Sequence, residues 1–351
     1  MVQAKLNRLR SFGVELNPLL QFVAQTKLNS WDIYPKNLLK AYYCLDYGKV
    51  ASPPEFLKSD HHFKKGVLNN LLKIKYAVDS YSPRNEEQTE IKNLLRLAFS
   101  SILIESSNLK RSPCLGYDKT KIVHDDAPMT LFDQKVHIIA EDLRSLQKDF
   151  KHCIFTKSEV ACCNSMEFVF PKRYDLVITS PPYMNGLDYV INYKIEMAWL
   201  DFISSQKDAK KIKDQMVVCD NVSKGLIKFF SISKKRYVNH WIDEIKQNIK
   251  KNIQTRGAYR RMDMPEIVHK YFDDMYNIME NVYRAMNKGG RFVLVVGDSL
   301  IADVYVPTDI IIAKIGQDLG LKIEKVELAR NRRSGQIRSY RLRESILTLK
   351  K

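Results

Sequence analysis

Two uninterrupted apolar runs of strand length constrain the fold most. They lie at residues 174–179 (YDLVIT) and 291–297 (RFVLVVG). A run without polar alternation is typical of a parallel strand that is covered on both faces. Segments with apolar residues at helical spacing separate the runs, so strands and helices alternate along the chain. The sequence therefore predicts an α/β fold with an open, mostly parallel sheet.

Weaker signals place the remaining elements. Short strands are predicted at residues 9–15 and 159–163, and Asn17-Pro18 is a typical helix start. Further helices are predicted over 136–150, 189–202 and 308–319, and from Pro265 to the pair Gly289-Gly290. Strands at 322–329 and 345–349 are expected to close the sheet as an antiparallel hairpin. The interrupted helical pattern between about residues 35 and 134 indicates a helical insertion.

These elements suggest five consecutive segments. They are a cofactor-binding segment of the catalytic domain (1–30), a helical insertion (31–133), a catalytic core (134–205), a basic target-recognition region (206–262) and the C-terminal strands of the core (263–351).

The charge favours a polyanionic partner. Lys and Arg exceed Asp and Glu by 57 − 40 = +17, and residues 206–261 hold 15 basic against 5 acidic side chains, with aromatic residues interleaved. An ordinary solvated face is the alternative, but this density favours double-stranded DNA, whose phosphates such side chains neutralise. The residues expected to contact DNA are Lys234, Lys235, Arg236, Arg260 and Arg261.

Other classes of protein are disfavoured. No apolar run approaches the ~18 residues of a membrane-spanning helix, and no membrane partner is expected. The six cysteines show no CxxC pair and no metal-ligand spacing. Scattered thiols of this kind are typical of a reduced, cytoplasmic protein, and we expect no metal site.

The most informative residues follow the first apolar run directly: Ser180, Pro181, Pro182 and Tyr183. Two consecutive prolines fix the backbone and remove two N–H donors. Carbonyl oxygens, a hydroxyl and an aromatic ring remain, a set that suits the exocyclic amino group of a flat base. The Ser180 oxygen and the Pro181 carbonyl can accept its two N–H bonds, while Tyr183 stacks on the ring. A plain Pro-Pro turn leaving a strand is the alternative.

The stretch DLVITSPPY (175–183) resembles the catalytic motif of the amino-group DNA methyltransferases, which modify cytosine N4 or adenine N6. GVELNPLLQFVAQTK (13–27), GGRFVLVVGDS (289–299) and LRESILTL (342–349) are similar to other segments of that family. The resemblance implies a Rossmann-like class I fold and S-adenosylmethionine as methyl donor. It further implies a flipped base and direct methyl transfer without a covalent enzyme intermediate.

The resemblance also assigns roles to residues. Glu15 is implied to hold the ribose hydroxyls of the cofactor, with Asn17 beside it, and Asn164 and Ser165 replace the family's usual Asp-Ser or Asp-Ala. A serine in the first position of the catalytic motif is more usual in cytosine-N4 enzymes, so Ser180 favours N4 over adenine N6. Asp298 either lines the cofactor cleft or caps a strand, and the sequence does not decide between the two.

One departure from the family is large. The glycine-rich cofactor loop, of the form Asp-Pro-Phe-x-Gly-x-Gly-Thr, belongs just upstream of residues 2–5, and no other segment supplies it. We therefore expect the loop and its central strand to come from a second polypeptide, or the chain to be a truncated, inactive DNA-binding relic. A methyltransferase acting on RNA or protein is a further alternative, and a cognate restriction endonuclease is a further expected partner.

Overall fold

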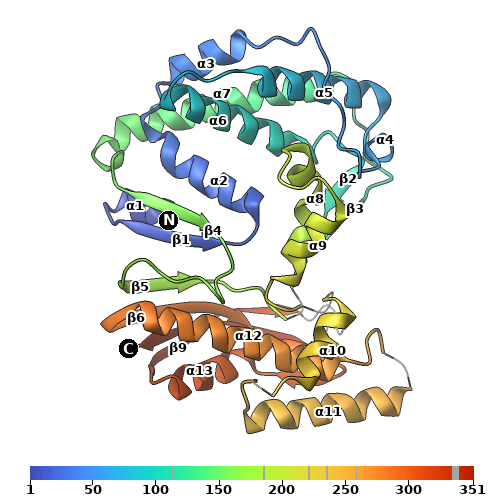
Figure 1. The fold of residues 1–351 in the computed structure, drawn as a ribbon, viewed down its shortest axis with the longest axis vertical. Coiled ribbons are helices and arrows are strands. Elements are labelled where there is room, and N and C mark those ends of the chain that lie inside the picture. The colour runs from blue at the N-terminus through green and yellow to red at the C-terminus, as the bar shows by residue number, and fades with distance from the viewer. Residues whose placement is uncertain (113, 185, 220–221, 235, 258, 334–339) are drawn as a thin grey trace. The chain divides into compact units, whose positions relative to one another are not determined.

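A computed structural model describes residues 1–351 except 113, 185, 220–221, 235, 258 and 334–339. The chain divides into two compact units (Figure 1). Unit 1 comprises Met1–Cys163 and Tyr189–Ile212, and unit 2 comprises Asn164–Asp188 and Lys213–Lys351. The predicted catalytic core (134–205) and basic region (206–262) are thus each shared between the units. The two units are described separately below.

Unit 1 is a helical body that carries one pair of parallel strands. Its elements are α1 (Val2–Leu6), β1 (Ser11–Glu15), α2 (Pro18–Asn29), η1 (Ser30–Asp32), α3 (Pro35–Tyr43), α4 (Ser59–His62), α5 (Lys65–Ser80), α6 (Glu86–Ile102), β2 (Leu109–Arg111), β3 (Leu115–Tyr117), α7 (Ala127–Asp149), η2 (Lys151–Cys153), β4 (Ser158–Cys162) and α8 (Tyr189–Trp199). β1 and β4 pair in parallel, with Ser11 opposite Ser158 and Glu15 opposite Cys162. α9 (Gln206–Asp214) begins in this unit and ends in unit 2.

The start of unit 1 follows its sequence signals closely. The predicted strand is β1. The predicted helix is α2, which begins at Pro18 and is capped by Asn17, the residue before it. The Asn17 Oδ1 atom accepts hydrogen bonds from the backbone N–H groups of Leu19 at 3.0 Å and Leu20 at 3.4 Å. These bonds satisfy two donors that have no partner within a helix. The region predicted as a helical insertion contains α3 to α6 and the start of α7, together with the small antiparallel hairpin of β2 and β3, which no sequence signal predicted.

Unit 2 is built on a four-stranded sheet. Its elements are β5 (Tyr174–Thr179), α10 (Lys224–Ile232), α11 (His240–Arg256), α12 (Met264–Ala285), β6 (Met286–Gly297), β7 (Ser299–Ile301), β8 (Val304–Val306), α13 (Thr308–Asp318), β9 (Lys322–Arg333) and β10 (Arg341–Lys350). The strand order is β5-β6-β10-β9. β5 and β6 are parallel, whereas β10 runs antiparallel to both β6 and β9. The C-terminal hairpin is present as expected, and in this mixed sheet β5, β6 and β9 run in one direction while β10 alone is reversed.

One face of the unit 2 sheet is a well-packed core. Phe292 and Leu294 of β6 and Leu347 and Leu349 of β10 are fully buried in one cluster with apolar residues of α12 and α13. α12 presents its predicted apolar stripe to this core, including the fully buried Tyr271. This burial of apolar surface is the main driving force for assembling the unit.

Two expectations for unit 2 are wrong. Gly289-Gly290 does not end the long helix, because α12 stops at Ala285 and the glycines lie inside β6. They pair with the chain end, where the N–H of Gly289 donates to the Lys351 carbonyl at 2.8 Å. β5 is also not buried on both faces: it lies at an edge of the sheet, and Leu176 and Ile178 are 51% and 66% exposed. A strand needs neighbours on both sides and cover on both faces to be buried, and β5 has only one paired edge.

Within the described part of the chain, none of the helices combines the length and apolar character that crossing a membrane requires.

Candidate active site

The Ser-Pro-Pro-Tyr loop (residues 180–183) leaves the carboxyl end of β5, where ligands of open α/β sheets bind. Ser180 is exposed, whereas Pro181 is buried and Met184 is fully buried in the core of unit 2. The loop closes on a hydrogen bond from the Gly186 N–H to the Tyr183 carbonyl at 2.7 Å. A Cβ at Gly186 would lie 2.5 Å from that carbonyl oxygen, so this turn requires glycine.

The ring of Tyr183 packs at the end of the neighbouring parallel strand. A Cβ placed on Gly297, the last residue of β6, would lie 2.8 Å from the Tyr183 ring and 2.8 Å from Nη2 of Arg332. The Arg332 guanidinium, from β9, lies 5.1 Å from the ring centroid, a cation–π distance. The absence of a side chain at Gly297 therefore makes room for an aromatic ring and a cation in contact.

This environment perturbs the phenol. Burial raises the pKa of Tyr183, and the negative charge of Glu344 adds to the effect. A side-chain hydrogen bond with Ser180 and the positive charges of Arg332 and Arg330 oppose it. The net direction is upward, so Tyr183 stays a neutral phenol at physiological pH. The ring contacts the Arg332 guanidinium, and the phenol shares a side-chain hydrogen bond with Ser180.

A buried polar network lies at the end of β6, directly after Gly297. Asp298 follows Gly297 directly, is fully buried and accepts hydrogen bonds from the Tyr305 hydroxyl and from Arg343 Nε, the latter at 3.1 Å. Arg343 also donates to Asp309 at 3.0 Å. Burial raises the pKa of Asp298. These bonds give Asp298 a structural role at the end of β6, while its Oδ1 atom has no hydrogen-bond partner among the described residues.

Glu15 and Asn17 lie together at the carboxyl end of β1 in unit 1. The Glu15 carboxylate accepts a hydrogen bond from the Asn17 backbone N–H at 2.8 Å, and burial raises its pKa. Asn17 is 4% exposed. Its Oδ1 atom caps α2, but its Nδ2 donor is buried without a hydrogen-bond partner among the described residues. A carboxylate acceptor beside an unused amide donor is a set that suits a pair of hydroxyl groups.

Asn164 and Ser165 belong to unit 2 and have local structural partners. The Asn164 side chain accepts the N–H of Met166 at 3.0 Å, as in an Asx-turn. Asn281 of α12 donates to the Ser165 carbonyl at 3.2 Å and to the Met166 carbonyl at 2.6 Å. These bonds fix the segment after β4, and no contact with a ligand is needed to explain them.

The residues predicted to contact DNA fall into two groups. Lys234 and Arg260 are exposed, whereas Lys235 lies outside the described residues. Arg236 lies over the Phe230 ring at 5.5 Å and 3.7 Å from Glu266. Arg261 makes two hydrogen bonds to the Asp263 carboxylate, at 2.8 and 2.6 Å, and its side chain is 13% exposed. Arg236 and Arg261 thus already have acidic partners within unit 2.

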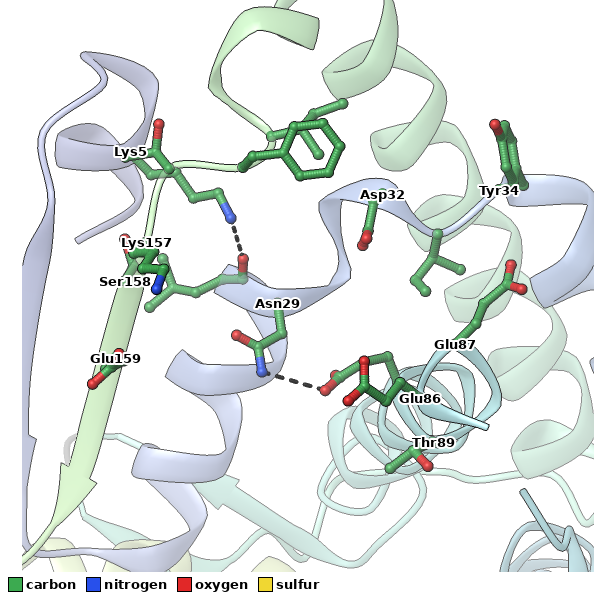
Figure 2. A pocket seen from close by; sticks show the side chains of 16 residues that line it. Lys5, Asn29, Asp32, Tyr34, Glu86, Glu87, Thr89, Lys157, Ser158 and Glu159 are labelled. Atoms are coloured by element: carbon green, nitrogen blue, oxygen red, sulfur yellow. Dashed lines mark hydrogen bonds between the residues drawn. The ribbon is translucent and has the colours of Figure 1, made fainter. Parts of the chain in front are cut away.

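A large cavity lies elsewhere, within unit 1 (Figure 2). Its volume is about 810 Å³, and residues of α2, α6 and the start of β4 are among those that line it. Lys5 donates to the Leu28 carbonyl at 2.5 Å, and Asn29 donates to Glu90 at 3.3 Å. Figure 2 marks a hydrogen bond at Lys5 and another at Asn29 with dashed lines. None of the predicted site residues lines this cavity, so cavity size alone does not locate the predicted chemistry.

The structure thus joins part of the predicted site and adds to it. Within unit 2 it places the Ser-Pro-Pro-Tyr loop beside Gly297 and Arg332, neither of which the sequence analysis had assigned to the site. Gly297 ends a predicted strand, and this position was the available signal, because parallel strands bring their carboxyl ends to one edge.

Known proteins resemble the chain over most of its length. It is 23% identical over 304 residues to the type II methyltransferase M.AvaI of Nostoc sp. (strain PCC 7120 / SAG 25.82 / UTEX 2576), covering 76% of this chain and 61% of that protein. It is 22% identical over 377 residues to M.BsoBI of Geobacillus stearothermophilus, covering 94% and 72%. M.MvaI of Kocuria varians is 21% identical over 351 residues, covering 90% and 71%. M.BsoBI and M.MvaI are also type II methyltransferases.

No known family profile matches the sequence. The chain spans 61% of the length of M.AvaI, less than two thirds of that relative. The curated relatives are type II methyltransferases, and the mixed α/β structure of the chain agrees with that similarity.

Proposed function

We propose that this chain is the catalytic part of a site-specific DNA methyltransferase that transfers a methyl group from S-adenosylmethionine to the exocyclic amino group of a flipped base, cytosine N4 in preference to adenine N6. The observation that carries the proposal is the Ser-Pro-Pro-Tyr loop at the carboxyl end of β5, with Tyr183 held against Gly297. The similarity to type II methyltransferases supports it.

The loop offers complementary groups to an amino group on a flat ring. The Ser180 hydroxyl oxygen and the Pro181 carbonyl accept the two N–H bonds, and the Tyr183 ring stacks on the base. Accepting both bonds raises electron density on the amino nitrogen and favours its attack on a methyl group. The raised pKa of Tyr183 keeps the stacking ring neutral. Because Pro181 and Met184 are buried, the loop is held in place before the base arrives.

Glu15 and Asn17 fit the ribose of the cofactor. The partly buried Glu15 carboxylate can accept from ribose hydroxyls, and the unused Nδ2 donor of Asn17 can donate to one. S-adenosylmethionine supplies a methyl group on a positively charged sulfur. Asn164 and Ser165 are proposed to contact its adenine, although the Asn164 oxygen already accepts the N–H of Met166.

We propose that DNA is bound through residues 206–261, chiefly through exposed side chains such as Lys234 and Arg260. Lys235, Arg236 and Arg261 belong to the same proposal. The local excess of 15 basic over 5 acidic residues supports this role. A restriction endonuclease with the same target is the proposed biological partner.

A segment outside these 351 residues is proposed to supply the glycine-rich part of the cofactor site. The chain's coverage of only 61% of M.AvaI is compatible with this proposal.

Mass spectrometry of nucleosides tests the proposal directly. DNA is incubated with S-adenosylmethionine and the reconstituted protein, which is the chain combined with the segment that carries the glycine-rich loop. The DNA is then hydrolysed, and its nucleosides are analysed. We expect N4-methylcytosine, and we expect none from the Ser180→Ala, Tyr183→Ala double variant. If N6-methyladenine is the sole product, the choice of cytosine is wrong. If the DNA stays unmodified although the reconstituted protein binds S-adenosylmethionine, the proposed methyltransferase activity is wrong.

A further inference from the structure

The outer face of α10 carries two large apolar side chains that the fold does not bury. The inner face attaches the helix to unit 2: Ile227 is buried in the core of that unit, and the buried Phe230 makes an edge-to-face contact with His269 of α12. On the outer face, Phe229 and Ile232 are each 74% exposed. They lie three residues apart, so they are neighbours on the helix surface. The packing of α10 therefore leaves this apolar pair free for a partner.

The charge around the apolar pair is positive only. Residues 221–242 contain five Lys or Arg residues and neither Asp nor Glu. Two of the five, Lys224 and Lys228, are exposed on α10 itself, and Lys228 directly precedes Phe229. The outer face of α10 is thus complementary to a partner that offers anionic groups beside apolar surface.

Two kinds of macromolecule have that chemistry: double-stranded DNA, in which phosphates flank stacked bases, and an anionic membrane. A helix that lies in a membrane surface needs its wide apolar face free to enter the lipid. On α10 that face is already occupied, because Ile227 and Phe230 are buried in unit 2. A narrow apolar pair beside two lysines matches the bases and phosphates of a duplex better.

We propose that the outer face of α10 enters a groove of double-stranded DNA, where Phe229 and Ile232 insert between neighbouring base pairs while Lys224 and Lys228 neutralise phosphates. Apolar side chains inserted in this way partly unstack the bases and kink the duplex. Because these two side chains have neither donors nor acceptors, they sense how easily a base step opens rather than the pattern of its edges. The choice of DNA rests on the proposed function, and the inference adds contact with the bases to the phosphate contacts proposed above.

DNA binding by the full chain, without S-adenosylmethionine, tests the apolar contact. Fluorescence anisotropy of a labelled duplex measures affinity, and energy transfer between dyes at its two ends measures bending at saturating protein. The Phe229→Ala, Ile232→Ala double variant should bind about 5- to 150-fold more weakly and lose the bend. Its dependence of affinity on salt should match that of the wild type, since no charge is removed. The matched control is Phe155→Ala in unit 1, where the phenylalanine is 85% exposed; affinity and bend should stay unchanged.

A second variant tests the lysines. Lys224→Ala, Lys228→Ala should lower the slope of log K against log [salt] by about two. At saturating protein the duplex should still bend, because Phe229 and Ile232 remain.

The inference is overturned if the wild-type chain binds the duplex without bending it, or if the apolar double variant binds and bends it as the wild type does. It is also overturned if the wild type binds vesicles of phosphatidylserine and phosphatidylcholine through Phe229 and Ile232 but does not bind the duplex. Failure of the proposed function is distinguishable: a duplex that is bent through Phe229 and Ile232, yet left unmethylated by the reconstituted protein, would uphold this surface and reject the methyltransferase activity.

Discussion

The two units end their parallel strand pairs in opposite ways. In unit 1, the outer side of β4 is covered by glutamine side chains of α2 that satisfy the Val160 backbone. In unit 2, β6 is the one strand that pairs with β5 among the described residues, and the apolar residues Leu176 and Ile178 of β5 are exposed. The chain therefore covers the edge of one strand with side chains, so the unpaired edge of β5 among the described residues is specific to that strand. β5 is also the strand that carries the candidate catalytic loop.

Removing the cover from β4 should have the largest effect. The Gln21→Ala, Gln25→Ala double variant leaves the N–H and the carbonyl of Val160 without partners, and Val160 is 8% exposed. Leaving a buried polar group unsatisfied costs about 1–3 kcal/mol, so losing both partners should lower the free energy of unfolding by roughly 2–6 kcal/mol. Urea denaturation followed by fluorescence of the buried Trp31 measures it. Gln247→Ala, at an exposed position of α11, is the control; an equal loss there would contradict the interpretation.

The loop carried by the bare strand gives the next largest effect. Tyr183→Ala removes a stacking surface worth about 1–3 kcal/mol, so kcat/KM for DNA methylation by the reconstituted protein should fall about 5- to 150-fold. Tyr183→Phe retains the ring and should keep most of the activity. Equal rates for the wild type and the alanine variant would show that Tyr183 does not stack on the base.

The buried ionisable side chains also differ between the units, and those of unit 2 predict that its stability depends on pH. In unit 1, Lys75 lies between two carboxylates, Asp79 at 2.9 Å and Asp201 at 2.6 Å. In unit 2, burial raises the pKa of Asp274 to about 6, despite its ion pair with Lys270. A carboxyl group whose pKa is higher in the folded state stabilises that state when protonated. This contribution is complete below about pH 4 and is lost as the pH rises through about 6.

The free energy of unfolding should therefore decrease by on the order of 1–3 kcal/mol between pH 4 and pH 7 through Asp274 alone. Urea denaturation at a series of pH values measures it. Asp274→Asn keeps an acceptor for the N–H of Val218, which donates to Asp274 at 3.0 Å, and removes the titration. The difference in the free energy of unfolding between variant and wild type should change with pH in this range. A constant difference would rule out Asp274 as the source of the pH dependence.

Local signals in the sequence predicted the local parts of the site. Asn17-Pro18 marked the start of α2 because a helix cap depends on neighbouring residues, and the apolar run at 174–179 identified β5 together with the loop after it. The exposure of β5 could not be predicted, since burial depends on which strands lie beside it. The contact of Tyr183 with Arg332 joins β5 to β9, which are far apart in the sequence.

The smallest effects concern DNA binding, where the structure separates the exposed side chains of Lys234 and Arg260 from the mostly buried side chain of Arg261. Each phosphate contact that is lost lowers the dependence of log K on log [salt] by about one unit. Lys234→Ala and Arg260→Ala, both at exposed positions, should each reduce this slope by about one, and together by about two.

Arg261 makes two hydrogen bonds to Asp263 and is mostly buried, so Arg261→Ala should lower stability and leave the slope unchanged. Fluorescence anisotropy with a labelled duplex at several salt concentrations measures the slopes. If the Arg261 variant changes the slope and the Lys234 and Arg260 variants do not, the ion pair with Asp263 opens on binding and the DNA contact lies on the Arg261 side of unit 2.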